Sequence, residues 1–320
     1  MRKSTKIWLV IAICLILVGC SMMAVTLHSL NWDLSGLDTG KYETNAYTVS
    51  QPFSNISVDT DTAEVIFALS PDGKCRVECF EEENGKHSVN VENDTLMIKT
   101  VNKTAWYDRI GIHLNTPKIK VNLPQKEYAA LSLRGDTGKV ELPEDFQFES
   151  VEILLTTGDV KVFASASAAM KIKTTTGNIL VENTVVGELG LRATTGIITA
   201  SDVACTGDLS VHISTGKTSL TNITCQNLLS EGDTGKIDLD NVVALKKFQI
   251  EWDTGDVTFT NSDAAEIYVE TDTGDVTGSL LSGKLFMVET DTGRVHIPQS
   301  TTGGRCQIET DTGDIKITIK

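Results

Sequence analysis

The sequence is poor in basic residues, cysteine and histidine, and each shortage excludes a class of function. Its 320 residues include 28 lysines and arginines against 43 aspartates and glutamates, a formal net charge of −15. So acidic a chain repels the phosphate backbone of DNA and RNA, and we predict no nucleic-acid partner. Five of the 7 cysteines lie beyond the first 30 residues, an odd number and too few for a disulfide framework.

Catalytic and metal-binding signatures are also missing from the sequence. The five histidines are scattered without a pair at metal-ligand spacing, and neither a G-x-S-x-G elbow nor a zinc motif occurs. Residues 214–218 resemble the end of a phosphate-binding loop, but Val211 stands where that motif needs a further glycine. We therefore expect that the protein is not an enzyme and has no cofactor.

What the sequence has instead is a repeat. A Thr-Gly dipeptide recurs every 19 or 20 residues through the C-terminal two-thirds of the chain. Its glycines are Gly138, Gly158, Gly177, Gly196, Gly216, Gly235, Gly255, Gly274, Gly293 and Gly313. A fixed period in this range is typical of stacked repeat proteins, in which each unit buries its apolar face only against the next.

Apolar residues flank each Thr-Gly at steps of two, which is the periodicity of a strand. They stand seven and five places before the glycine and again two and four places after it, as at Val160 and Val162. Because the inward parity changes across the glycine, the chain must turn a corner there, and a residue without a Cβ favours a tight corner. The pattern predicts an all-β fold, a single-stranded parallel β-solenoid (β-helix) of about ten coils made of short strands joined by corners.

Two upstream regions depart from this repeat. Residues 56–65 match residues 267–276 with Ala63 in place of the glycine, so we expect the solenoid to begin there. An insertion at about residues 71–126 alternates as antiparallel strands, with Asn84-Gly85 as a hairpin turn signal. We predict a first coil and β cap at residues 51–128, and repeats at 129–320. Trp106 and Tyr107 would plug the cap or, alternatively, line a ligand groove.

The N-terminus carries one long apolar run. Residues 7–30 contain no Asp, Glu, Lys or Arg, follow three basic residues and are long enough to cross a bilayer. The charges on either side predict a cytoplasmic tail at 1–6, a transmembrane helix at 7–30, a linker at 31–50 and an extracellular solenoid. Residues 17–20 also resemble a lipobox, which would make Cys20 a lipidation site after cleavage. The apolar run continues past Cys20, which favours the uncleaved span.

Two sets of side chains are candidate sites. Asp stands two places before the glycine in the last five repeats: Asp233, Asp253, Asp272, Asp291 and Asp311. Carboxylates stacked at about 4.8 Å could bind Ca²⁺, but we favour a turn role, in which each Asp accepts hydrogen bonds from its own backbone. Cys205 and Cys225 each fall nine places after a repeat glycine, so they should stack on adjacent coils. There they could form a disulfide or be two small buried thiols.

The printed sequence ends inside the strand expected at residues 314–319. No residues then remain to cover the final coil, so we predict an open edge at this end. We expect such an edge to bind either a partner or a second copy of the chain, the second being self-association through this C-terminal coil.

The corners T-T-G-D-V and D-T-G-D-V, behind one apolar span and the segment Trp32-Asp33-Leu34, resemble the bacterial putative-adhesin family of unknown function (DUF4097 type). The resemblance covers residues from about 50 to the end, and implies a β-solenoid on the cell surface with no catalytic residues to carry over. We therefore expect a membrane-anchored, adhesin-like binding or scaffolding surface, with a protein or envelope polysaccharide as partner. The alternative is a regulatory accessory protein of an envelope-stress system, acting beside its own span.

Overall fold

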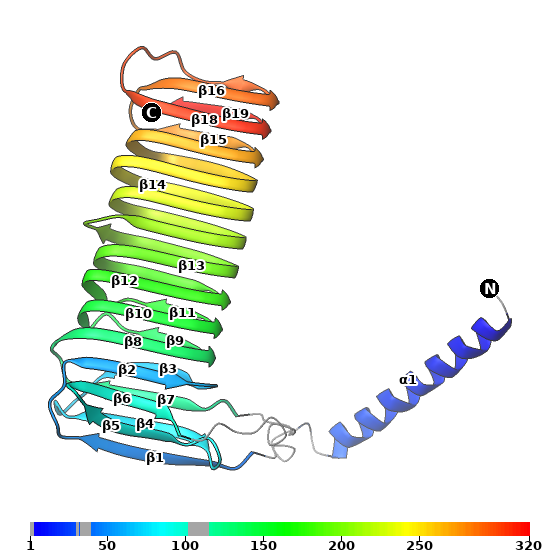
Figure 1. The fold of residues 1–320 in the computed structure, drawn as a ribbon. Coiled ribbons are helices and arrows are strands. Elements are labelled where there is room, and N and C mark those ends of the chain that lie inside the picture. Colours follow the sequence, from blue (N-terminus) through cyan, green and yellow to red (C-terminus); the bar gives the residue numbers. More distant parts are fainter. Residues whose placement is uncertain (1–2, 30–31, 33–39, 102–114) are drawn as a thin grey trace. The chain divides into compact units, whose positions relative to one another are not determined.

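The computed structural model describes residues 3–29, 32, 40–101 and 115–320. Helix α1 and the strands belong to two different compact units. The helix is the only one among the described residues, and 19 strands form a single sheet in which most neighbours are parallel (Figure 1).

Helix α1 (Lys3–Ser29) is apolar on all sides from Ile7 onward, and most side chains of that part are exposed. Its segment Thr5–Ser29 has a mean hydropathy of 2.7, and no part of it is buried by other protein. At about 1.5 Å per residue this segment exceeds the roughly 30 Å of a bilayer core. By length and composition α1 can therefore serve as a membrane anchor or as an export signal.

The N-terminal part of the sheet contains seven strands: β1 (Tyr42–Val49), β2 (Asn55–Thr60), β3 (Glu64–Leu69), β4 (Cys75–Glu82), β5 (His87–Glu92), β6 (Thr95–Thr100) and β7 (Lys118–Leu123). The repeats form the rest: β8 (Glu127–Thr137), β9 (Val140–Leu142), β10 (Gln147–Thr157), β11 (Val160–Val162), β12 (Ser165–Thr176), β13 (Ile179–Cys205), β14 (Leu209–Thr273), β15 (Val276–Leu280), β16 (Lys284–Thr292), β17 (Val295–His296), β18 (Gly304–Thr312) and β19 (Ile315–Ile319).

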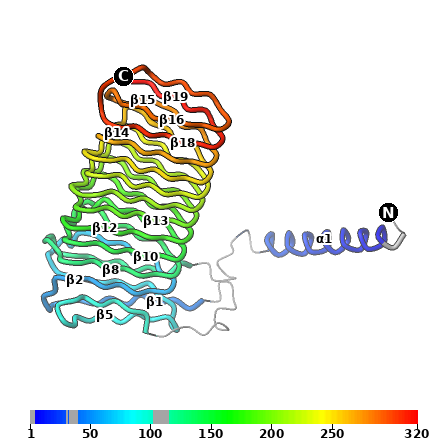
Figure 2. The backbone as a smooth tube through the Cα atoms, turned by 45° about the horizontal axis from the view of Figure 1, so that its top comes forward, coloured from blue at the N-terminus to red at the C-terminus, as the bar shows by residue number. Residues whose placement is uncertain are grey.

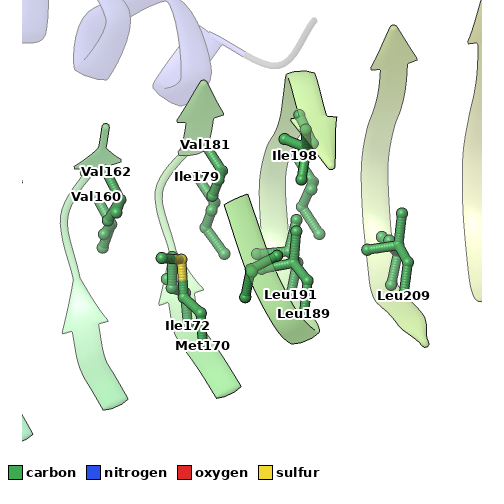
Figure 3. Packing of buried hydrophobic residues seen from close by; sticks show 14 of the residues in the cluster. Val160, Val162, Met170, Ile172, Ile179, Val181, Leu189, Leu191, Ile198 and Leu209 are labelled. Carbon is green, nitrogen blue, oxygen red and sulfur yellow. The ribbon is translucent and has the colours of Figure 1, made fainter. Parts of the chain in front are cut away.

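The repeats pair in parallel with the register that the sequence predicts. Val151 lies beside Met170, Met170 beside Leu189, and Leu189 beside Leu209. Each of these residues stands seven places before its repeat glycine, so equivalent positions stack on one another. The sheet thereby winds into a column of coils that both views show (Figures 1 and 2). Valine, isoleucine and leucine side chains fill its interior (Figure 3).

The glycine corners stack more closely than any residue with a Cβ could. A Cβ built on any of the ten repeat glycines would come within 1.6–2.2 Å of a backbone carbonyl oxygen in a neighbouring coil. The corners also hydrogen-bond in the ladder, as where the N–H of Gly177 donates to the carbonyl of Thr195 at 3.0 Å. Strands continue unbroken through four of the ten corners. The expectation of short strands is therefore wrong for β13, which runs through Gly196, and for β14, which runs through Gly216, Gly235 and Gly255.

A second set of stacked corner residues stands six places after the repeat glycine, and we did not predict this second corner from the sequence. Its residues have a left-handed backbone with φ between 49° and 55°: Asn183, Asp202, Asn222, Asn241 and Asn261. Asn and Asp tolerate this conformation better than other residues with side chains. Their side chains also bond along the stack, from Asn222 Nδ2 to Asp202 Oδ1 and from Asn241 Nδ2 to Asn222 Oδ1, each at 2.9 Å.

At the N-terminal end the sheet follows an order different from the sequence. Strands β2 and β3 pair in parallel with β8 and β9, which confirms that residues 56–65 are an early coil. On their other side they pair in parallel with β6 and β7, and these pair in antiparallel fashion with β5 and β4. The early coil thus lies between the insertion and the first repeat.

Two expectations for the cap need correction. The hairpin turn is not Asn84-Gly85 but Asn93-Asp94, which joins β5 to β6 and in which both residues have positive φ, as a tight two-residue hairpin requires. Residues 42–49, which we assigned to the linker, form β1, and this strand pairs with β4. Trp106 and Tyr107 lie outside the described residues.

The C-terminal end contradicts the expected order of coils. Strand β18 pairs with β14 on one side and with β16 on the other, and β19 pairs with β15 and β17. The last coil in the sequence is therefore inserted between its two predecessors, and β16 lies beyond it at the end of the column (Figure 1). The expected open edge at residues 314–319 is wrong for Ile315 and Lys316, which pair on both sides, whereas residues 317–319 pair only with β15.

Candidate binding surface

One long face of the column is lined by the outward side chains two and four places before each repeat glycine, and we call it the charged face. The residues at four places before the glycine are, in stack order, Arg134, Leu154, Lys173, Arg192, His212, Glu231, Glu251, Glu270, Glu309 and Glu289. In the half nearer the N-terminal cap every residue of this row except Leu154 is basic, and in the other half every one is acidic.

The acidic half carries a second row of carboxylates beside the first. These are the five Asp residues noted in the sequence, Asp233, Asp253, Asp272, Asp291 and Asp311, all of them exposed. Together the two rows bring ten carboxylates to this half of the face. At roughly 5 Å, two like charges repel by about 1–3 kcal/mol at effective dielectric constants between 80 and 20, so this arrangement costs stability.

Neutral donors hold three of the five glutamates of this half in place without cancelling their charge. Gln249 Nε2 donates to Glu251 at 2.6 Å, and Tyr268 and Gln307 donate to Glu270 and Glu309. The hydrogen bond to Glu270 raises the pKa of Tyr268 to about 12. Each donor stands two residues before its glutamate on the same strand. The acidic half is therefore an ordered array of charges.

The turn role that we expected for the five Asp is filled by a different residue of the repeat. Among the described residues, no hydrogen bond or ion pair involves the carboxylates of the five Asp. Instead the residue after the glycine accepts a backbone N–H from the neighbouring coil: Asn178 N–H reaches Asp159 at 2.9 Å, and Asp314 N–H reaches Asp275 at 2.7 Å. The corner is thus capped between coils rather than within one.

Calcium binding by the five Asp stays a prediction. Within the part of the chain that the structure describes, one group of three metal-ligating side chains has its ligand atoms within 4.8 Å of one another, and it contains none of these residues.

The basic half holds a shallow depression. Gly190 and Ser210 replace longer side chains at its floor, and Lys171, Lys173 and Arg192 stand around it. At the boundary between the halves, His212 Nδ1 lies 3.2 Å from Glu231 Oε2. The sequence contains the signal for this division into a basic and an acidic half. The residues four places before the repeat glycines are mostly basic in the early repeats and acidic in the later ones, but we did not predict the two halves from it.

Cys205 and Cys225 are buried on adjacent coils, as expected, since Ala204 pairs with Thr224 just before them. Both thiols are free in the structure, and Cys205 Sγ donates to the carbonyl of Gly187 at 3.2 Å. Burial raises the pKa of the Cys225 thiol to about 12. A disulfide between the two stays a prediction. The same holds for lipidation of Cys20, which is exposed within α1.

The repeat architecture has a counterpart among known families. Residues 53–210 and again residues 204–320 match the Toastrack DUF4097 family. The chain belongs to this family. The resemblance inferred from the corners is thereby confirmed, and no functionally curated protein matches the chain.

Several solved bacterial structures are similar to this Toastrack protein. A putative adhesin from Bacteroides fragilis is 16% identical, with a TM-score of 0.39 over 87% of this chain and 97% of its own. A putative adhesin and a putative lipid binding protein from Parabacteroides distasonis are each 15% identical with TM-scores of 0.39, over 85% and 88% of this chain and 98% of their own. At such identities the likeness does not extend to function.

Proposed function

We propose that this Toastrack protein is a membrane-anchored β-solenoid that serves as an adhesin-like binding or scaffolding surface at the outside of the cell. In this proposal α1 spans the membrane, with a short cytoplasmic tail before it and the solenoid exposed outside. The apolar length of α1 and the basic residues before it support the anchor.

The observation that carries the proposal is the acidic half of the charged face. Ten stacked carboxylates weaken the fold, and neutral hydrogen-bond donors order three of them, on Glu251, Glu270 and Glu309, without neutralising their charge. A rigid array of this kind suits a partner that presents positive charges at regular spacing, because an ordered array loses little entropy on binding. We infer that a protein or polysaccharide of the envelope with such cationic groups binds there.

The experiment compares two variants of residues 40–320 for binding to whole cells of the source bacterium. One variant neutralises the face by Glu251→Gln, Asp253→Asn, Glu270→Gln and Asp272→Asn. The control changes four exposed acids away from that face, by Glu141→Gln, Glu144→Gln, Asp145→Asn and Asp240→Asn, and so has the same net charge. Unfolding temperatures check that both variants are folded.

We expect the face variant to bind about ten- to a hundred-fold more weakly than the control, since four exposed charge pairs contribute roughly 0.5 kcal/mol each. Binding of wild type should also weaken as salt is raised. Equal binding by the two variants would refute the assignment of the face. Binding that requires α1 would instead favour a regulatory partner within the membrane.

A further inference from the structure

Three buried side chains of types that bind transition metals meet in the N-terminal cap. Cys79 and Glu81 stand two residues apart on β4, so both point inward, and His87 begins β5. Their exposed fractions are 0%, 0% and 5%. Their candidate ligand atoms all lie within 4.8 Å of one another. The sequence shows no standard metal motif here, because the spacing follows the strands and not a known signature.

Glu81 is a carboxylate that requires a positive partner at this depth. Its Oε1 accepts a hydrogen bond from Asn45 Nδ2 at 2.8 Å, and its Oε2 accepts one from the His87 backbone N–H at 2.8 Å. Among the described residues no lysine or arginine forms an ion pair with it, and nearby Lys86 pairs with Glu43 instead. Because a buried charge without compensation is costly, a charged Glu81 needs either the His87 ring or a bound cation to balance it.

The thiol of Cys79 favours the bound cation. An ion pair of His87 with Glu81, whose Nδ1 and Oε2 atoms are 2.7 Å apart, accounts for those two residues alone. The ion pair gives no role to Cys79 Sγ, the third potential ligand atom of the group. Thiolate, imidazole and carboxylate together are the ligand set of Zn²⁺ and related ions.

We propose that Cys79 Sγ, Glu81 Oε2 and His87 Nδ1 bind a first-row transition metal ion of the Zn²⁺ class, with water as the fourth ligand. Ligand atoms of a tetrahedral zinc ion lie about 3.5 Å apart, so side-chain shifts of about 1 Å bring these three atoms into place. On binding, Cys79 gives up its thiol proton and the His87 imidazolium gives up its Nδ1 proton, both to solvent, and the Glu81–His87 hydrogen bond opens.

Supporting contacts for such a site are already present. Thr60 Oγ1 lies 3.0 Å from His87 Nε2, where it accepts the ring N–H that remains when Nδ1 binds the metal. Asn45 holds the outer oxygen of Glu81, and the Tyr47 hydroxyl donates to the His87 carbonyl at 3.0 Å. Partners of this kind fix the orientation of metal-binding histidines and carboxylates.

The test uses the full chain, purified in detergent, loaded with Zn²⁺ or Co²⁺ and then desalted. Elemental analysis measures bound zinc, and absorption spectroscopy detects the thiolate-to-Co²⁺ charge-transfer band in the near ultraviolet. The variants are Cys79→Ser, Glu81→Gln and Thr60→Val. The control is Cys75→Ser, which alters the other buried thiol of β4 outside the group.

We expect one metal ion per chain and the charge-transfer band in wild type and in Cys75→Ser. Cys79→Ser should lose the band, Glu81→Gln should lose the metal, and Thr60→Val should bind about 10- to 100-fold more weakly. Wild-type protein that retains no zinc, or whose cobalt complex lacks the thiolate band, would overturn the proposal even if a variant misfolds. Equal loss in Cys75→Ser would overturn it as well, and the His87–Glu81 ion pair would then be the sole role of the group.

Discussion

Replacing Gly235 with alanine should disrupt the middle of the stack. A Cβ on Gly235 would lie 1.7 Å from the carbonyl oxygen of Gly216, and real Cβ atoms essentially never approach closer than 3.0 Å. The obstacle is backbone, so no side-chain rotation relieves it. The two coils must separate, which weakens the hydrogen bonds of the corner on both sides.

The magnitude follows from two contributions. Gly235 has a φ of +146°, a conformation that costs a residue with a Cβ about 1–3 kcal/mol. Each corner hydrogen bond weakened by the separation adds about 1 kcal/mol. The free energy of unfolding should therefore fall by about 3 kcal/mol or more, which lowers the melting temperature by roughly 6–12 °C for a chain of this size. Gly235→Val should be worse, because a β-branched side chain is larger and stiffer.

Thermal unfolding of residues 40–320, followed by circular dichroism, measures the effect. The matched control is Gly190→Ala, since a Cβ at Gly190 would meet its nearest atom, Ser210 Oγ, at an ordinary 3.4 Å. We expect the control to melt with wild type. The reasoning fails if Gly235→Ala also melts with wild type, or if Gly190→Ala loses as much stability.

Three further predictions follow from the anchor, the coil order and the buried thiols. The full chain with Cys20→Ser should still fractionate with membranes, because α1 suffices as an anchor; its release into the medium would instead indicate a lipoprotein. Deleting residues 304–320 should remove hydrogen-exchange protection from β16 as well, since β18 lies between β14 and β16, and unchanged protection there would contradict the observed order. Burial raises the pKa of Cys225 and of Cys306 from 9.0 to about 12, so between these values the folded chain retains protons that the unfolded chain releases. The melting temperature should therefore fall as pH rises from about 9 to 12, and Cys225→Ala with Cys306→Ala should reduce that slope; an equally steep fall in the double variant would rule out the thiols as its cause.

The repeat itself determined most of the fold. Because equivalent positions recur every 19 or 20 residues, a register that buries one of them buries them all, as Met170 and Leu189 show. The family followed from the same corners. The repeat also predicted that glycine is needed at the corners. From the sequence we gave a tight turn as the reason, whereas in the structure the reason is the close approach of a carbonyl oxygen from the neighbouring coil.

The candidate sites were less accessible to sequence reasoning. The repeat pattern and the predicted stacking together place both rows of carboxylates and the basic row on one face, but we predicted only the row of Asp from the sequence. Cys79, Glu81 and His87 carry no motif, because an inward-facing pair on one strand and the first residue of the next meet only when β4 and β5 are placed around the same interior.

The tertiary structure alone decided the order of coils at both ends. A repeat sequence predicts that each coil stacks on the next, since the nearest coil in sequence costs the least loop entropy to reach. Near-identical coils, however, present nearly the same apolar surface and the same backbone ladder to any neighbour. The coil of β18 and β19 can therefore pair as well with β14 and β15 as with the coil of β16 and β17, and it pairs with both. The sequence determined what a coil is, but it could not determine which coil lies at the end, because repetition makes the alternatives nearly equal in local energy.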